Sequence, residues 1–154
     1  MPYLAGIVLA LTVSGVATLV GFDRDRAFYP TLLVVIASYY VLFAVIGGSS
    51  HAIGVETLVM TGFLLVATLG FKGNLWLIVA ALAAHGVFDL LHRFLVANPG
   101  VPAWWPAFCL NYDVTAAAFL GWLLISRRTG GRVDGWTGGR ADGRTGGRGE
   151  SNLN

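Results

Sequence analysis

The stretch LWLIVAALAAHGVFDLLHRFLV, residues 75–96, decides the fold. It is apolar over about the 20 residues that a helix needs to cross a hydrocarbon core of about 30 Å, yet it contains His85, Asp89 and His92. At about 100° per residue, positions i, i+4 and i+7 fall within roughly 60° of one another, so the three side chains share one helix face. An Asp at the centre of a bilayer costs on the order of 2.5–3.5 kcal/mol even on a lenient scale. This face therefore requires a partner, a cavity or a ligand.

The composition is that of a membrane protein. Of the 154 residues, 56% are hydrophobic and only 12% are charged, whereas an average soluble domain has about 25% charged residues. The single cysteine, Cys109, excludes an internal disulfide. The arginines are scattered or confined to a glycine-rich tail, so no nucleic-acid partner is expected. The expected partner is the lipid bilayer.

The hydropathy pattern predicts an all-α, polytopic membrane protein, in which residues 1–128 form one bundle of five transmembrane helices. The spans are predicted at about residues 3–22, 30–47, 52–71, 75–96 and 105–126, separated by short polar or proline-rich breaks. Residues 129–154 form an imperfect octamer repeat rich in Gly and Arg, with almost no apolar side chains to repay the entropy of ordering. We expect this tail to be disordered.

The distribution of basic residues predicts the orientation. Five spans put the termini on opposite sides, and a cytoplasmic C-terminus leaves only Arg93 on the outer half of the bundle. The positive-inside rule therefore favours N-out, C-in. The basic residues then on the cytoplasmic side, besides those of the tail, are Arg24, Arg26, Lys72, Arg127 and Arg128. In this orientation the polar residues of the third, fourth and fifth spans meet in the outer half of the bilayer.

His85, His92 and Asp113 are the candidate metal ligands, because two imidazoles and a carboxylate bind zinc or non-haem iron. The same residues are equally suited to acid/base catalysis, with Asp89 orienting an imidazole. A structural alternative pairs Asp89 with Arg93 at i, i+4 and bonds the histidines to neighbouring helices. The remaining polar candidates for the cavity are Glu56, Cys109 and Arg93.

These further candidates also have structural interpretations. Glu56 is near the start of its span, where water and the helix dipole suit a negative charge. Cys109 could be a small buried hydrophobe. The hydroxyls of Tyr39 and Tyr40 are candidate cavity-lining groups, although such groups often serve helix packing.

The chain resembles a family of small, uncharacterised bacterial multi-pass membrane proteins. The resemblance rests on FDRDRAFYP at residues 22–30, HGVFDLLH at 85–92, and VPAWWPAFC at 101–109 followed by Asp113. It covers about residues 1–128 and implies a location in the bacterial inner membrane.

Two functions from different classes are compatible with this sequence. The first is an enzyme that acts on a lipid-like substrate at the outer leaflet, with a divalent metal or acid/base groups at His85, His92, Asp113 and Asp89. The alternative is a non-catalytic membrane subunit or a transporter-like protein, in which the cluster is a proton relay or packs the helices together. Metal analysis separates them.

Overall fold

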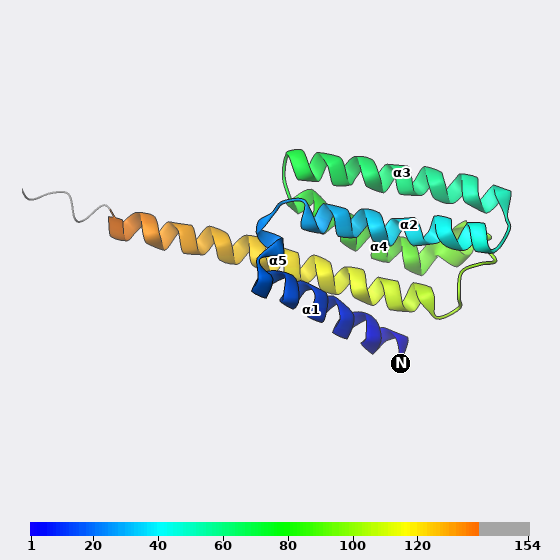
Figure 1. The fold of residues 1–154 in the computed structure, drawn as a ribbon, viewed down its shortest axis with the longest axis horizontal. Coiled ribbons are helices and arrows are strands. Elements are labelled where there is room, and N and C mark those ends of the chain that lie inside the picture. Colours follow the sequence, from blue (N-terminus) through cyan, green and yellow to red (C-terminus); the bar gives the residue numbers. More distant parts are fainter. Residues whose placement is uncertain (139–154) are drawn as a thin grey trace, which may run out of the picture. The chain divides into compact units, whose positions relative to one another are not determined.

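The computed structural model describes residues 1–138, with side chains through Arg127, and this part of the chain is helical (Figure 1). Its elements are α1 (Pro2–Val20), the short 3₁₀ helix η1 (Phe22–Arg24), α2 (Phe28–Ile46), α3 (Ser50–Lys72), α4 (Trp76–Leu95) and α5 (Trp105–Gly138). Each α-helix is long and apolar enough to span a membrane, the last over Trp105–Arg127. The predicted bundle of five membrane-spanning helices is confirmed, and the protein is a multi-pass membrane protein.

The chain divides into two compact units, Met1–Gly121 and Trp122–Asn154. The first contains α1 to α4 and the start of α5, and the described part of the second is the rest of α5. The sequence predicted that the last helix ends at about residue 126, whereas it continues to Gly138. Helix propensity does not explain the extension, because residues 129–138 include four glycines, each costing about 1 kcal/mol relative to alanine. The rest of the predicted disordered tail, residues 139–154, lies outside the described residues.

Local sequence determines where the helices end. Gly21 follows α1 with a φ of 91°, a left-handed conformation that glycine adopts without steric cost. The Ser49 hydroxyl accepts a hydrogen bond from the main-chain N–H of Ala52 and caps the start of α3. At the other end of α3, the Arg26 guanidinium donates to the carbonyl oxygen of Gly73 at 2.7 Å. This contact satisfies one of the carbonyl groups that a helix leaves unpaired at its C-terminus.

Small residues let the helices of the first unit approach closely, as is usual in membrane bundles. A Cβ atom at Gly6 of α1 would collide with the main-chain oxygen of Phe108 of α5. Gly86 of α4 lies against Leu110 of α5, and a Cβ there would be 3.3 Å from its side chain. These contacts place α1 and α4 directly against α5. The candidate set of His85, His92 and Asp113 required the fourth and fifth spans to be neighbours, and the contact of Gly86 with Leu110 shows that they are.

Successive helices of the first unit run in opposite directions, with α3 packed most extensively on α2 (Figure 1). The starts of α1, α3 and α5 therefore lie at the same end of the bundle as the ends of α2 and α4. Polar residues in the early part of α3 and α5 and in the later part of α4 come to similar depths for this reason.

Candidate metal centre

Three carboxylates and two histidines from α3, α4 and α5 are buried in the first unit. Each is at most 2% exposed: Glu56, His85, Asp89, His92 and Asp113. In a bundle surrounded by lipid, a buried ionisable group must find its partners inside the protein. Their contacts divide the five residues into two clusters.

The first cluster joins α4 to α5. The Nδ1 atom of His85 lies 2.7 Å from Oδ2 of Asp113, within hydrogen-bonding distance. The same nitrogen is 3.5 Å from Oδ2 of Asp89, one turn further along α4. The prediction that Asp113 lies within side-chain reach of His85 is confirmed, and both side chains point into the bundle.

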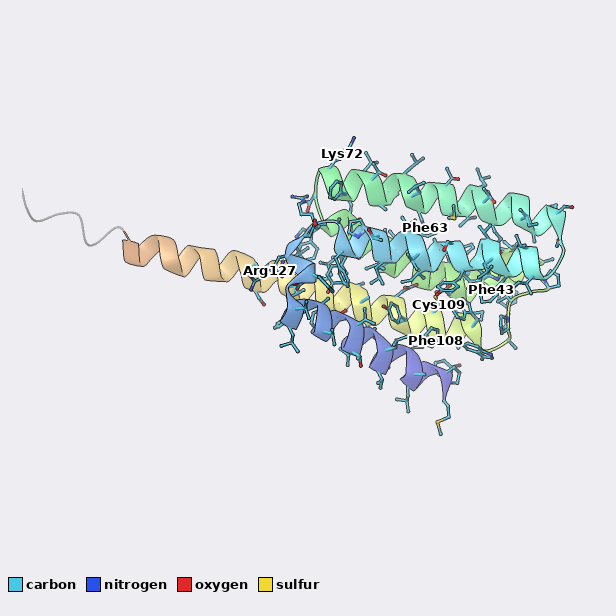
Figure 2. The ribbon with its side chains drawn as sticks, viewed as in Figure 1. Phe43, Phe63, Lys72, Phe108, Cys109 and Arg127 are labelled. Carbon is cyan, nitrogen blue, oxygen red and sulfur yellow. The ribbon has the colours of Figure 1, made fainter. Side chains whose placement is uncertain are left out.

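Cys109 belongs to the same cluster. It precedes Asp113 by one turn of α5. Figure 2 labels Cys109 and the preceding residue, Phe108. The Cys109 thiol donates to Oδ2 of Asp113 at a sulfur–oxygen distance of 3.9 Å. The side chain is buried, as the hydrophobe interpretation required, but it also brings a sulfur atom to the carboxylates.

The four residues His85, Asp89, Cys109 and Asp113, hereafter the α4–α5 cluster, each offer one metal-ligand atom, and these atoms lie within 4.8 Å of one another. Ligand atoms around a tetrahedral zinc ion at about 2.0–2.3 Å are separated by roughly 3.3–3.8 Å. The separations of 3.5 Å for His85–Asp89 and 3.9 Å for Cys109–Asp113 are close to this range. The 2.7 Å separation of His85 and Asp113 is a hydrogen bond instead, so this pair would have to separate slightly around an ion.

Each carboxylate of the two clusters has one oxygen that accepts no hydrogen bond from the described residues. These atoms are Oε2 of Glu56, Oδ2 of Asp89 and Oδ1 of Asp113. Leaving a buried acceptor without a donor costs about 1–3 kcal/mol, and more for a charged group. Two of the three atoms belong to the α4–α5 cluster. Protons or a cation would remove this cost.

Tyr40 of α2 supplies a partner for Asp89. Its buried hydroxyl donates a hydrogen bond to Oδ1 of Asp89 at 2.6 Å. The sequence analysis predicted both Tyr39 and Tyr40 as cavity-lining candidates and did not distinguish between them. A signal was present, because Tyr40 lies at helical spacing from Leu33, Ala37 and Ala44, all on the buried face of α2.

The second cluster consists of Glu56, His92 and Asn98. The Nε2 atom of His92 lies 2.6 Å from Oε1 of Glu56. The side-chain amide of Asn98, in the loop after α4, donates to the same oxygen and to the main-chain oxygen of Tyr40, both at 3.0 Å. Glu56 is therefore not in water at the end of its helix. The sequence analysis did not single out Asn98 as a member of the polar network.

His92 therefore contributes no atom to this cluster. Of the predicted ligand set, the structure brings His85 and Asp113 together and places His92 beside Glu56. His92 does share a helix face with His85, as predicted. Seven residues of helix nevertheless separate the two by about 10 Å along the axis, which places His92 level with Glu56. Asp89 and Cys109 take its place beside His85 and Asp113.

Arg93 is exposed and lies outside both clusters, with its guanidinium 4.5 Å above the Phe94 ring. Asp89 bonds to Tyr40, so the alternative Asp89–Arg93 pair is not what holds this carboxylate. Arg93, His92 and Asn98 do line one pocket of about 670 Å³ beside the loop after α4.

A second cavity reaches the α4–α5 cluster from another side. This groove of about 380 Å³ lies between α1, α2 and α5, and its lining is mainly apolar. Val13, Ile36 and Trp105 line it together with Cys109. Cys109 is thus both part of the groove wall and a member of the cluster.

Comparison with known proteins finds no matching family model, curated protein or solved structure. The fold and the site therefore define the class directly: a multi-pass helical membrane protein with nitrogen, oxygen and sulfur ligand atoms clustered in its interior.

Proposed function

We propose that the protein binds a divalent transition metal of the zinc type at the α4–α5 cluster. The observation that carries the proposal is the gathering of four buried ligand atoms within 4.8 Å. Imidazole nitrogen, thiolate sulfur and carboxylate oxygen are the atoms that bind zinc in proteins, and thiolate disfavours magnesium or calcium. The cluster fits such an ion in chemistry, and it fits in spacing once His85 and Asp113 separate slightly from their 2.7 Å hydrogen bond.

The carboxylate oxygens that accept no hydrogen bond support a metal over a purely structural network. A network that served only to pack helices would gain nothing from acceptors without donors. Asp89 and Asp113 each present one such oxygen. A cation at the cluster would engage both, and it would offset the like charge of two neighbouring carboxylates.

We further propose that the metal serves an enzymatic activity on a lipid-like substrate. A zinc ion, when bound, supplies a polarised carbonyl or an activated water to such a reaction. The apolar groove along α1, α2 and α5 reaches the cluster at Cys109, so a substrate in the groove meets the site without crossing water. His85, Asp89, Cys109 and Asp113 would then hold the ion beside the substrate.

A second candidate function is a proton relay in a non-catalytic subunit or transporter-like protein. It is favoured by the succession of contacts from Tyr40 through Asp89 and His85 to Asp113. The contact between Asp89 and His85 is 3.5 Å, however, and is not among the hydrogen bonds of the described residues. A relay would require this gap to close.

We also propose a bacterial inner-membrane location with the N-terminus outside and the C-terminus in the cytoplasm. The support is the one-sided distribution of basic residues under the positive-inside rule. Because the clustered residues lie toward the end of the bundle where α1, α3 and α5 begin, this orientation puts the site in the outer half of the bilayer.

Metal analysis of the purified full chain in detergent tests the metal proposal. Wild type should carry a stoichiometric divalent metal, and His85→Ala should lose it while remaining folded. His51→Ala is the matched control, since His51 is an exposed histidine of α3, and it should retain the metal. Equal metal in all three proteins would place it outside the cluster. A folded wild type that takes up no zinc would favour the proton relay.

A further inference from the structure

Tyr40 contacts both polar clusters through three different groups. Its hydroxyl donates to Asp89, its ring stacks on His92, and its main-chain oxygen accepts from Asn98. The side chain is 1% exposed. Tyr40 links the α4–α5 cluster to the Glu56–His92–Asn98 cluster through two hydrogen bonds and a ring stack, whereas the Phe88 ring meets His85 and His92 through ring contacts alone.

The hydroxyl gives the two oxygens of Asp89 different roles. Oδ1 accepts the Tyr40 hydrogen bond at 2.6 Å. Oδ2 accepts none and lies 3.5 Å from Nδ1 of His85, facing the other ligand atoms. A carboxylate held at one oxygen cannot rotate freely about its last torsion. The hydrogen bond therefore fixes which oxygen is available to an ion.

The Tyr40 ring is itself held on several sides. It stacks on the His92 ring, with centroids 4.1 Å apart, and meets the Phe88 ring edge-on at 5.7 Å. Hydrogen bonding to Glu56 fixes the orientation of His92 in turn. A ring clamped in this way presents its hydroxyl to Asp89 from one direction only.

We propose that Tyr40 is a positioning residue of the metal centre, and that the Glu56–His92–Asn98 cluster acts on the centre by holding Tyr40 in place. The inference rests on the proposed metal site and assigns a role to a polar cluster that provides none of its ligands. Hydrogen-bond partners that orient metal ligands typically account for a 10- to 100-fold difference in metal affinity. Tyr40 is such a partner, because its hydroxyl donates a hydrogen bond to the carboxylate of Asp89, a proposed metal ligand.

The decisive variant is Tyr40→Phe, which keeps the ring and its stack but removes the hydroxyl. The full chain in detergent, first freed of metal, is titrated with Zn²⁺ and, separately, with Co²⁺, whose absorption spectrum reports ligand geometry. Tyr40→Phe should bind both ions about 10- to 100-fold more weakly than wild type, with a changed Co²⁺ spectrum. Tyr39→Phe is the matched control, because Tyr39 is the neighbouring, exposed tyrosine and its ring lies 5.0 Å from Trp105; it should bind like wild type.

Glu56→Gln tests whether the second cluster acts through Tyr40. Glutamine keeps the size of the side chain while changing its bond to His92. Affinity should fall in the wild-type background and should not fall further in the Tyr40→Phe background, since residues acting along one route give non-additive effects. The single variant Glu56→Gln also tests the proposal should Tyr40→Phe fail to fold.

The outcomes are separable. Wild-type affinity and spectrum in a folded Tyr40→Phe protein would overturn the role of Tyr40 while leaving the metal site standing. Independent, additive losses from Tyr40→Phe and Glu56→Gln would overturn the route through Tyr40. Absence of Zn²⁺ and Co²⁺ binding in wild type would overturn the metal site itself.

Discussion

The rings of Tyr40 and His92 stack with an interplanar angle of 21°, and this stack is where the two buried polar clusters meet. His92 bonds to Glu56 on one side, and Tyr40 bonds to Asp89 on the other. Stacked ring faces offer no hydrogen-bond donor to one another. A displacement of His92 therefore reaches Asp89 through the position of a ring and not through the transfer of a proton.

Replacing Asp113 by Asn distinguishes a metal site from helix packing. Asparagine preserves the shape of the side chain and can still bond to His85, so the free energy of unfolding should fall only by about 0.6–2 kcal/mol, the scale of interhelical hydrogen bonds in membranes. Bound metal should be lost, because a neutral amide is a poor ligand. Thermal stability and metal content are measured on the same preparation.

Asn111→Ala serves as the comparison for Asp113→Asn. Asn111 lies on the same helix but donates to its own helix at the carbonyl oxygen of Ala107, so metal content should not change. Loss of stability in Asp113→Asn with full metal retention would show that Asp113 only packs helices.

His92→Ala should leave the amount of metal bound at saturation unchanged, in contrast to His85→Ala. His92 contributes no atom to the group of clustered ligands. Its removal leaves the buried Glu56 carboxylate with Asn98 as its hydrogen-bond partner among the described residues. Loss of a hydrogen bond to a buried acceptor lowers the free energy of unfolding by about 1–3 kcal/mol. Denaturation in detergent should show this loss. A stoichiometric loss of metal would return His92 to the ligand set that the sequence predicted.

Gly6→Ala tests the close approach of α1 to α5. An added methyl group would collide with the main-chain oxygen of Phe108, and overpacking of this kind costs about 1–3 kcal/mol. Gly15→Ala, on the same helix, meets nothing within 4 Å and should be neutral or slightly stabilising. The difference in melting temperature between the two variants is the measurement, since both make the same change in helix propensity. Equal melting temperatures would argue against a tight α1–α5 contact.

Reporter fusions test the proposed orientation. A reporter fused after Arg128 should report the cytoplasm and one fused after Gly48 should report the outside, because three spans, α3, α4 and α5, lie between the two points. Cytoplasmic activity at Gly48 would contradict the assignment. Inverting both signals would reverse the side on which the site lies.

Sequence alone predicted the helices well, because hydropathy over about 20 residues reports the one property that a membrane span must have. It also predicted that His85 meets Asp113, since an ionisable group inside a bilayer needs a partner and both lie at similar depth. It did not separate His92 from His85, although seven residues of helix imply about 10 Å along the axis, because the two were grouped by their shared face alone. Tyr40 and Asn98 were not placed for a different reason: their partners lie 49 and 42 residues away in the chain, and no local pattern reports such contacts.

The Arg26 side chain has two roles, one in membrane insertion and one in the folded bundle. During insertion its positive charge counts toward topology, a reading in which lysine would serve equally well. In the folded bundle its guanidinium closes the end of α3 at Gly73, a contact that depends on the reach and shape of arginine. Arg26→Lys should therefore produce chains that are inserted in the correct direction yet hold the end of α3 less firmly. At this position a substitution can therefore impair the fold of the bundle without changing the direction of insertion.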